Sequence, residues 1–151
     1  TDHHKAFNEN PNILAVFSAA NCYVSATWCT DPHGGSTWNY MSVHMYGKIR
    51  FMSDEELINF MKKFTLKFEN GNTQSETIYD NLPSEYLKKY MPAIIGFELK
   101  AERMDNTFKL SQNKDLQSFE NIINELNKSE NYKQKFIAKE MEKRKNKIFN
   151  K

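Results

Sequence analysis

The residue types best suited to chemistry in this sequence lie in the run from Ser36 to Tyr46. Trp38, Tyr40 and His44 stand at alternate positions, so an extended strand would place them on one face. Stacking between flat aromatic rings adds about 0.5 to 1.5 kcal/mol beyond their burial. The pattern favours a planar polar ligand, although a core layer or a dimer interface would also use such a face.

A second polar group lies at the end of a later strand-like segment. Lys109, Ser111, Gln112 and Asn113 combine one cation with three hydrogen-bonding side chains, which suits carbonyl, amide or phosphate groups. The alternative is an ordinary polar strand end that leads into a helix cap at Asp115. No glycine-rich phosphate loop occurs, so any cofactor phosphate must be bound by side chains.

Other reaction classes have little support in the sequence. His44 has no Glu or second His at ligand spacing beside it, so we expect no metal site. Ser18, Ser25 and Ser36 lack the Gly-x-Ser-x-Gly pattern of a hydrolase nucleophile. We therefore assign no catalytic residue.

Composition predicts a compact domain with a polar appendage, because 39% of the 151 residues are hydrophobic while the mean hydropathy is -0.76. No apolar stretch approaches the roughly 20 residues that span a bilayer, and the first residues contain no apolar signal core. We expect a cytoplasmic protein without a membrane partner. Cys22 and Cys29 match no common zinc spacing, and we expect free, inert thiols.

Charge is distributed unevenly along the chain. Residues 128–151 contain nine Lys or Arg against three Glu, a net charge of +6, while the remainder has a net charge of -4. This division predicts a domain over residues 1–127 and a basic helical tail over 128–151. The tail is suited to contacting DNA phosphates, although a solvated helix face has the same composition.

Local patterns predict the elements. We expect strands over Ile13–Ser18 and Tyr23–Trp28, joined by a turn at the polar break Ala20-Asn21-Cys22. A loop over Asp31–Ser36 and a long strand over Trp38–Met52 follow. Ser53 and Glu56 form a capping box that begins a helix over about 54–69, and Gly71 stops its pattern. A short helix starts at Pro83–Ser84. Strand types return over Ile94–Arg103 and Thr107–Ser111, with a hairpin turn at Asp105–Asn106, and two amphipathic helices follow.

This order predicts the α+β class, with an antiparallel sheet that closes toward a split β-barrel, flanking helices and a helical tail. Clustered strands joined by short turns favour hairpins over parallel crossovers. A helical bundle conflicts with the many aromatic and β-branched residues between Ile13 and Met52.

Five motifs in order carry a family resemblance, which spans roughly residues 10 to 127. The chain resembles the PaiB-like family of FMN-binding split-barrel proteins. The motifs are Ser25-Ala26-Thr27-Trp28, Thr37-Trp38-Asn39-Tyr40, Val43-His44 with Gly47, Ile95-Gly96-Phe97-Glu98, and Lys109-Leu110-Ser111-Gln112-Asn113.

The resemblance implies a homodimer of the pyridoxamine-phosphate-oxidase type, with FMN in clefts between the subunits. It also implies a negative transcriptional regulator of protease production and sporulation genes. The implied cofactor-binding residues are those of the matching motifs together with the aromatic strand. They are Ser25, Trp28, Thr37, Trp38, Asn39, Tyr40, His44, Lys109, Ser111, Gln112 and Asn113.

Two other functions stay open. Bound flavin would also serve an oxidoreductase that uses a nicotinamide donor, although no nicotinamide motif is present. A haem-binding split barrel would use His44 as an axial ligand. Family members carry further strands before the position of Ile13, so the resemblance implies a barrel that is incomplete at its N-terminus.

Overall fold

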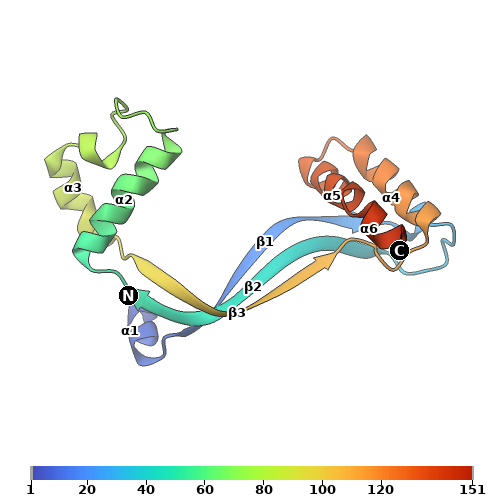
Figure 1. Cartoon of the computed structure of the whole chain (residues 1–151), viewed down its shortest axis with the longest axis horizontal. Coiled ribbons are helices and arrows are strands. Elements are labelled where there is room, and N and C mark those ends of the chain that lie inside the picture. Colours follow the sequence, from blue (N-terminus) through green and yellow to red (C-terminus); the bar gives the residue numbers. More distant parts are fainter. Residues whose placement is uncertain (1, 151) are drawn as a thin grey trace. The chain divides into compact units, whose positions relative to one another are not determined.

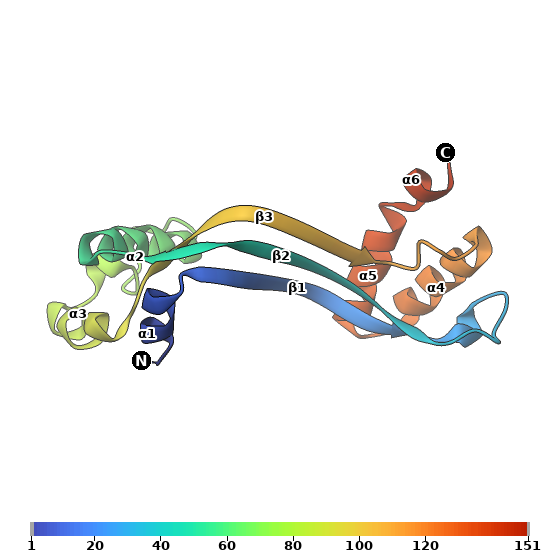
Figure 2. The ribbon, with the colours of Figure 1, turned by 90° about the horizontal axis from the view of Figure 1, so that it is seen from below.

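The computed structural model describes residues 2–150, which form six α-helices and a three-stranded sheet. The strands are β1 (Asn12–Val24), β2 (Thr37–Phe51) and β3 (Phe97–Lys109), and Figure 2 shows them side by side in the order β1-β2-β3. The helices are α1 (Asp2–Glu9), α2 (Asp54–Phe68), α3 (Ser84–Tyr90), α4 (Leu116–Lys128), α5 (Tyr132–Glu142) and α6 (Lys145–Phe149). Three 3-10 turns, η1 (Ala26–Trp28), η2 (Tyr79–Asn81) and η3 (Met91–Ala93), complete the order.

The central strand β2 is antiparallel to β3. The Met52 N–H donates to the Gly96 carbonyl at 2.9 Å, and Arg50 forms an ion pair with Glu98 at 2.6 Å. Further back along β2, the Arg103 guanidinium lies 3.8 Å from the centre of the Tyr46 ring. Residue numbers on the β3 side rise from 96 to 103 as those of their partners on the β2 side fall from 52 to 46, so the two strands are antiparallel.

The predicted α+β class with an antiparallel sheet and flanking helices is confirmed. The sheet is open, with β1 and β3 at its edges, and such a sheet is consistent with a split barrel. Two compact units share its strands. Unit 1 comprises Thr1–Ile13 and Gly47–Glu102, and unit 2 comprises Leu14–Tyr46 and Arg103–Lys151.

Unit 1 contains α1, α2 and α3. The predicted capping box is confirmed: the Glu56 N–H donates to Ser53 Oγ at 3.2 Å, and the Ser53 N–H donates to the Glu56 carboxylate at 2.9 Å. Arg50 also donates to this carboxylate, and these hydrogen bonds lower the pKa of Glu56 to about 2. Helix α2 ends at Phe68, close to its predicted end near residue 69, and Gly71 follows with a φ of 76°, which suits a residue without a Cβ.

Unit 2 holds the larger buried cluster. Residues of β1 and of the segment after β3 pack against one face of α4 and α5, which lie side by side in Figure 1. The buried members are Cys22, Val24, Leu110, Phe119, Ile122, Ile123, Leu126, Ile137, Ala138 and Met141. The predicted tail residues 128–151 therefore contain α5, which carries part of this core, and the short α6, which the sequence interpretation missed.

Cys22 and Cys29 are both free thiols, as predicted, and burial supports the predicted inertness of Cys22. Cys22 is only 3% exposed. Burial raises the pKa of the Cys22 thiol to about 11, so it stays protonated and unreactive at neutral pH.

Two predicted turns are wrong. The Ala20-Asn21-Cys22 break and the Asp105-Asn106 hairpin both lie inside continuous strands, β1 and β3. Asn21 is exposed while Cys22 is buried, so a polar residue here marks the outer face of a strand. The favoured two-residue hairpin needs positive φ, which among the described residues only Asn70, Ser111 and Gly71 adopt.

The packing at Gly47 makes a testable prediction. A Cβ at this buried β2 position would overlap the Lys100 carbonyl on β3, so Gly47→Ala must push the two strands apart. We expect a loss of about 1–3 kcal/mol in unfolding free energy, measured by urea denaturation. Gly35→Ala is the control, because nothing lies within 4 Å of a Cβ there. Equal midpoints for the two variants would contradict this close strand approach.

Candidate functional site

A buried amide joins three elements of unit 2. Asn39 on β2 is 0% exposed, and its Oδ1 accepts a hydrogen bond from Ser111 Oγ at 3.1 Å. Its Nδ2 donates to the sulfur of Met141 on α5 at 3.4 Å. Ser111 has a φ of 61°, which is uncommon for a residue other than glycine and is sustained here by its surroundings. Asn39 therefore fixes β2 to the segment after β3 and to α5.

A second hydrogen-bonded pair, Thr37 and Lys109, lies two residues before Asn39 and Ser111 in the sequence. Lys109 Nζ donates to Thr37 Oγ1, and the lysine is exposed while the threonine is half-buried. The structure thus brings together four residues of the predicted site in two hydrogen-bonded pairs. They supply one cation and a hydroxyl at the surface, with an amide and a second hydroxyl beneath.

The Gln112 side chain stabilises the turn after β3 through two hydrogen bonds to the backbone. Its Oε1 accepts from the Leu110 N–H at 2.6 Å, and its Nε2 donates to the Phe108 carbonyl. The side chain therefore closes the bend that places Ser111 against Asn39. Asn113, one residue later, is exposed.

The opposite face of β2 presents aromatic rings. Trp38 is 54% exposed and Tyr40 is 38% exposed, which agrees with the predicted alternation about Asn39. Tyr23 on β1 meets Trp38 edge to face, with ring centres 6.1 Å apart. A cavity of about 290 Å³ lies beside these rings, and its wall is polar as well as aromatic. Its lining residues are Ser18, Ala19, Asn21, Trp38, Tyr40, Met41 and Ser42.

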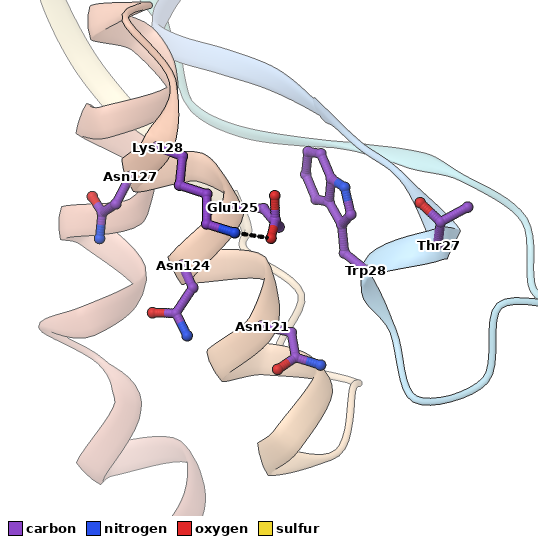
Figure 3. Close-up of a pocket in the computed structure, with 7 residues that line it drawn as sticks. All are labelled: Thr27, Trp28, Asn121, Asn124, Glu125, Asn127 and Lys128. Atoms are coloured by element: carbon purple, nitrogen blue, oxygen red, sulfur yellow. Dashed lines mark hydrogen bonds and ion pairs between the residues drawn. The ribbon is translucent and has the colours of Figure 1, made fainter.

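Trp28 and Ser25 lie at a different place in unit 2. Ser25 caps η1 by accepting from the Thr27 N–H at 3.3 Å, and Trp28 packs on the core beside α4. Figure 3 shows the Trp28 ring turned toward α4, across a groove of about 600 Å³. The other residues of this groove are mostly amides and charges: Thr27, Asn121, Asn124, Glu125, Asn127 and Lys128. Trp28 and Trp38 therefore line different cavities.

His44 is half-buried in β2 and lines none of the cavities described above. Within residues 2–150 no group of three or more His, Cys, Asp or Glu side chains could hold a metal ion. None of the helices described here is long and apolar enough to cross a membrane.

Several residues of these cavities were missed from the sequence. Asn21 was assigned to a turn, and its place opposite Trp38 depends on β1 being continuous. The α4 amides Asn121, Asn124 and Asn127 recur every three residues, and this helical spacing was the signal available. The partner of Asn39, Met141, is 102 positions away and gives no local signal.

Comparison with known proteins decides the family. Residues 1–103 match the family described as "Putative FMN-binding domain". The chain belongs to this family. FMN is the cofactor that membership assigns, and the matched residues include β1, β2 and the Trp38–Tyr40 face.

Two relatives of this FMN-binding family member were found. The chain is 30% identical over 138 residues, 91% of its length, to "Protease synthase and sporulation protein PAI 2" of Bacillus subtilis. It is 31% identical over 118 residues, 66% of its length, to "Uncharacterized protein AN0679" of Emericella nidulans. The chain spans 66% and 46% of the lengths of these relatives. The predicted PaiB-like resemblance is confirmed.

The residues of the Trp38 cavity fit a flavin. A flavin has a flat ring with an apolar edge and an edge of carbonyl, imide and ring-nitrogen groups. Exposed rings of Trp38 and Tyr40 suit the flat part, and the Asn21 amide with the Ser18 and Ser42 hydroxyls suits the polar edge. Lys109 is an exposed cation in the same unit, suited to a phosphate.

The buried amide makes a second prediction. Asn39→Ala would leave the Ser111 hydroxyl buried without its acceptor, at a cost of about 1–3 kcal/mol in unfolding free energy. A double-mutant cycle with Ser111→Ala should give a coupling of about 1 kcal/mol, measured by urea denaturation. Asn113→Ala is the exposed control, with a change within about 0.5 kcal/mol. An Asn39→Ala variant as stable as the control would show that the hydrogen bond contributes nothing.

Proposed function

We propose that the protein binds FMN between two copies of the chain, with the flavin ring against the Trp38–Tyr40 face. The observation that carries this proposal is that Trp38, 54% exposed, stands beside a cavity walled by an amide and hydroxyls. An exposed Trp38 ring lacks the favourable free energy of burying its apolar surface, and a flat ligand stacked on it would supply that burial. The family's FMN assignment supports the same ligand.

The proposed role of each side chain follows from its chemistry. Trp38 and Tyr40 orient the ring by stacking and shield one face from water. Asn21, Ser18 and Ser42 provide donors and acceptors for the polar edge, and Lys109 neutralises the phosphate. Bound FMN supplies hydride or single-electron transfer, which is the chemistry an oxidoreductase with a nicotinamide donor would use.

The homodimer is proposed from the surface of β1. Leu14, Val16, Phe17 and Tyr23 are between 46% and 56% exposed, all within unit 2. These exposed apolar side chains are divided between the two faces of the edge strand, with Leu14 and Val16 on one face and Phe17 and Tyr23 on the other. Exposed apolar residues on an edge strand favour a protein contact, and the unpaired backbone of that edge adds hydrogen-bonding groups. A second copy would cover these residues and close the open side of the neighbouring Trp38 cavity.

A regulatory role is the second candidate, and the basic tail is the feature that favours it. Lys143 and Arg144 pair with the buried Glu140 and lower its pKa, and Lys145 pairs with Glu120. Lys133 and Lys139 on α5 are exposed and form no ion pair within the described residues. These two free cations are the proposed contacts to DNA phosphates, as the resemblance to a regulator implies.

The FMN proposal predicts the effect of removing one ring. Trp38→Ala should weaken FMN binding about tenfold, because both stacking and contact area are lost. The measurement is quenching of flavin fluorescence on titration with protein, and the bound spectrum separates flavin from the haem alternative at His44. The control is Tyr132→Ala on α5, which removes an aromatic side chain that is 74% exposed and lies outside the cavity.

Equal affinities for the two variants would reject the Trp38 face as the flavin site. Sedimentation velocity of the wild-type protein tests the interface separately. FMN bound at full stoichiometry to a monomer would reject the inter-subunit position while leaving the flavin site in place.

DNA binding predicts a salt dependence. Replacing both Lys133 and Lys139 by Glu should weaken binding and lower the slope of log K against log salt by about 2, since each phosphate contact contributes about 0.9. The measurement is fluorescence anisotropy of a labelled duplex at several salt concentrations. The control replaces the exposed Lys63 and Lys67 of α2. Equal losses in both double variants would show only a general charge effect.

A further inference from the structure

Unit 1 contains an apolar cavity far from any residue assigned to FMN along the chain. It has a volume of about 300 Å³ and lies among α2, η2, α3 and η3. The two main helices neighbour each other in Figure 1. Half of its lining is aliphatic or thioether: Met61, Leu82, Leu87, Met91 and Ile94. Methionine side chains adapt readily to the shape of a bound molecule.

The polar atoms of two lining residues are already used. Thr65 Oγ1 donates to the Met61 carbonyl at 2.9 Å and accepts from the Tyr79 N–H at 2.9 Å. Thr77 Oγ1 is hydrogen-bonded to Ser75 Oγ at 2.9 Å. These hydroxyls therefore serve the fold and offer little to a ligand.

Three tyrosines supply the remaining wall. The rings of Tyr86 and Tyr90 are 4.5 Å apart, and Tyr79 lies on η2. Their phenol hydroxyls have no hydrogen-bond partner among residues 2–150, so they can donate to or accept from a ligand. None of the ten described lining residues is charged. Lys62 approaches the Tyr79 ring at 5.9 Å, and Asp80 pairs with it at 2.7 Å.

A second cavity lies directly beside the first. It has a volume of about 390 Å³, and Leu87 and Met91 line both cavities. Hollows on both sides of these two residues leave their side chains room to change rotamer, which a close-packed core would deny. The apolar cavity can therefore widen for a ligand without unfolding α2.

We propose that this cavity binds a small uncharged aromatic molecule that carries a single polar group, such as a phenol or an indole. The ten lining residues carry no charge, and the nearest cation apart from the paired Lys62 is the exposed Lys89, 5.1 Å from the Tyr90 ring centre. An anion inside the cavity would therefore lose most of its water for a single exposed counter-charge, which favours a neutral ligand over phosphates, carboxylates and FMN itself. The volume is at the lower end of the roughly 300–1,000 Å³ of ligand sites, which limits the ligand to one or two rings. The phenol hydroxyls meet the polar group, and the aliphatic side chains cover the rings.

The test uses the intact chain with ¹³C-methyl methionine and 2-naphthol as the probe. The sequence has seven methionines, and of these Met61 and Met91 line the cavity. Their methyl signals should shift saturably on titration, while that of Met141 in the core of unit 2 stays unchanged. Shifts spread over all methionines, or none up to the solubility limit of the probe, would overturn the proposal.

Two neighbouring variants complete the test. Ile94 lines the cavity and is 40% exposed, while Ile95 does not line it and is 48% exposed. Ile94→Trp should fill the space and weaken naphthol binding at least about tenfold, and Ile95→Trp should change it less than about twofold. Equal binding by both variants would overturn the site.

Two further results would also overturn the proposal. If Met61 and Met91 shift with protein concentration in the absence of naphthol, a second copy occupies the cavity. If FMN shifts these two signals, the cavity accepts an anion. Because the readout is confined to unit 1 and uses no flavin, it stands whether or not FMN binds in unit 2.

Discussion

The alternation of side chains along β2 is the constraint on which the site depends. Asn39 points into the core of unit 2, and its neighbours Trp38 and Tyr40 consequently stand in solvent. A slip of one residue in strand register would bury the aromatic rings and expose the amide. The Asn39–Ser111 hydrogen bond opposes such a slip, since a buried Ser111 hydroxyl without its acceptor would be costly.

The Asn39–Ser111 hydrogen bond also explains how the residues at the end of β3 support the Thr37–Tyr40 segment of β2. Ser111 has to adopt a positive φ to reach Asn39, and Gln112 closes the bend that allows it. Lys109 is thereby placed beside Thr37 at the surface. At the end of β3 and just after it, Ser111 and Gln112 thus serve the architecture and Lys109 offers a cation, although their residue types alone suited a ligand site as well as a polar strand end.

Local signals predicted much of the fold. The Ser53–Glu56 capping box and Gly71 after α2 could be recognised in the sequence, because helix ends have residue signatures within about four positions. The alternation about Asn39 was likewise visible in the order of residue types. Continuity of β1 and β3 was not, because Asn21 and Asp105–Asn106 have turn chemistry and only pairing across the sheet makes them strand residues. The burial of Asn39 depends on Met141, which no local pattern links to it.

The proposed flavin position on the Trp38 face can be tested directly. The two tryptophans of the chain, Trp28 and Trp38, line different cavities, so their indole N–H signals in a ¹⁵N NMR spectrum report on the two places separately. Addition of FMN should shift or broaden the Trp38 signal and leave the Trp28 signal nearly unchanged. A response confined to Trp28 would place the flavin in the groove beside α4 and rule out the Trp38 face.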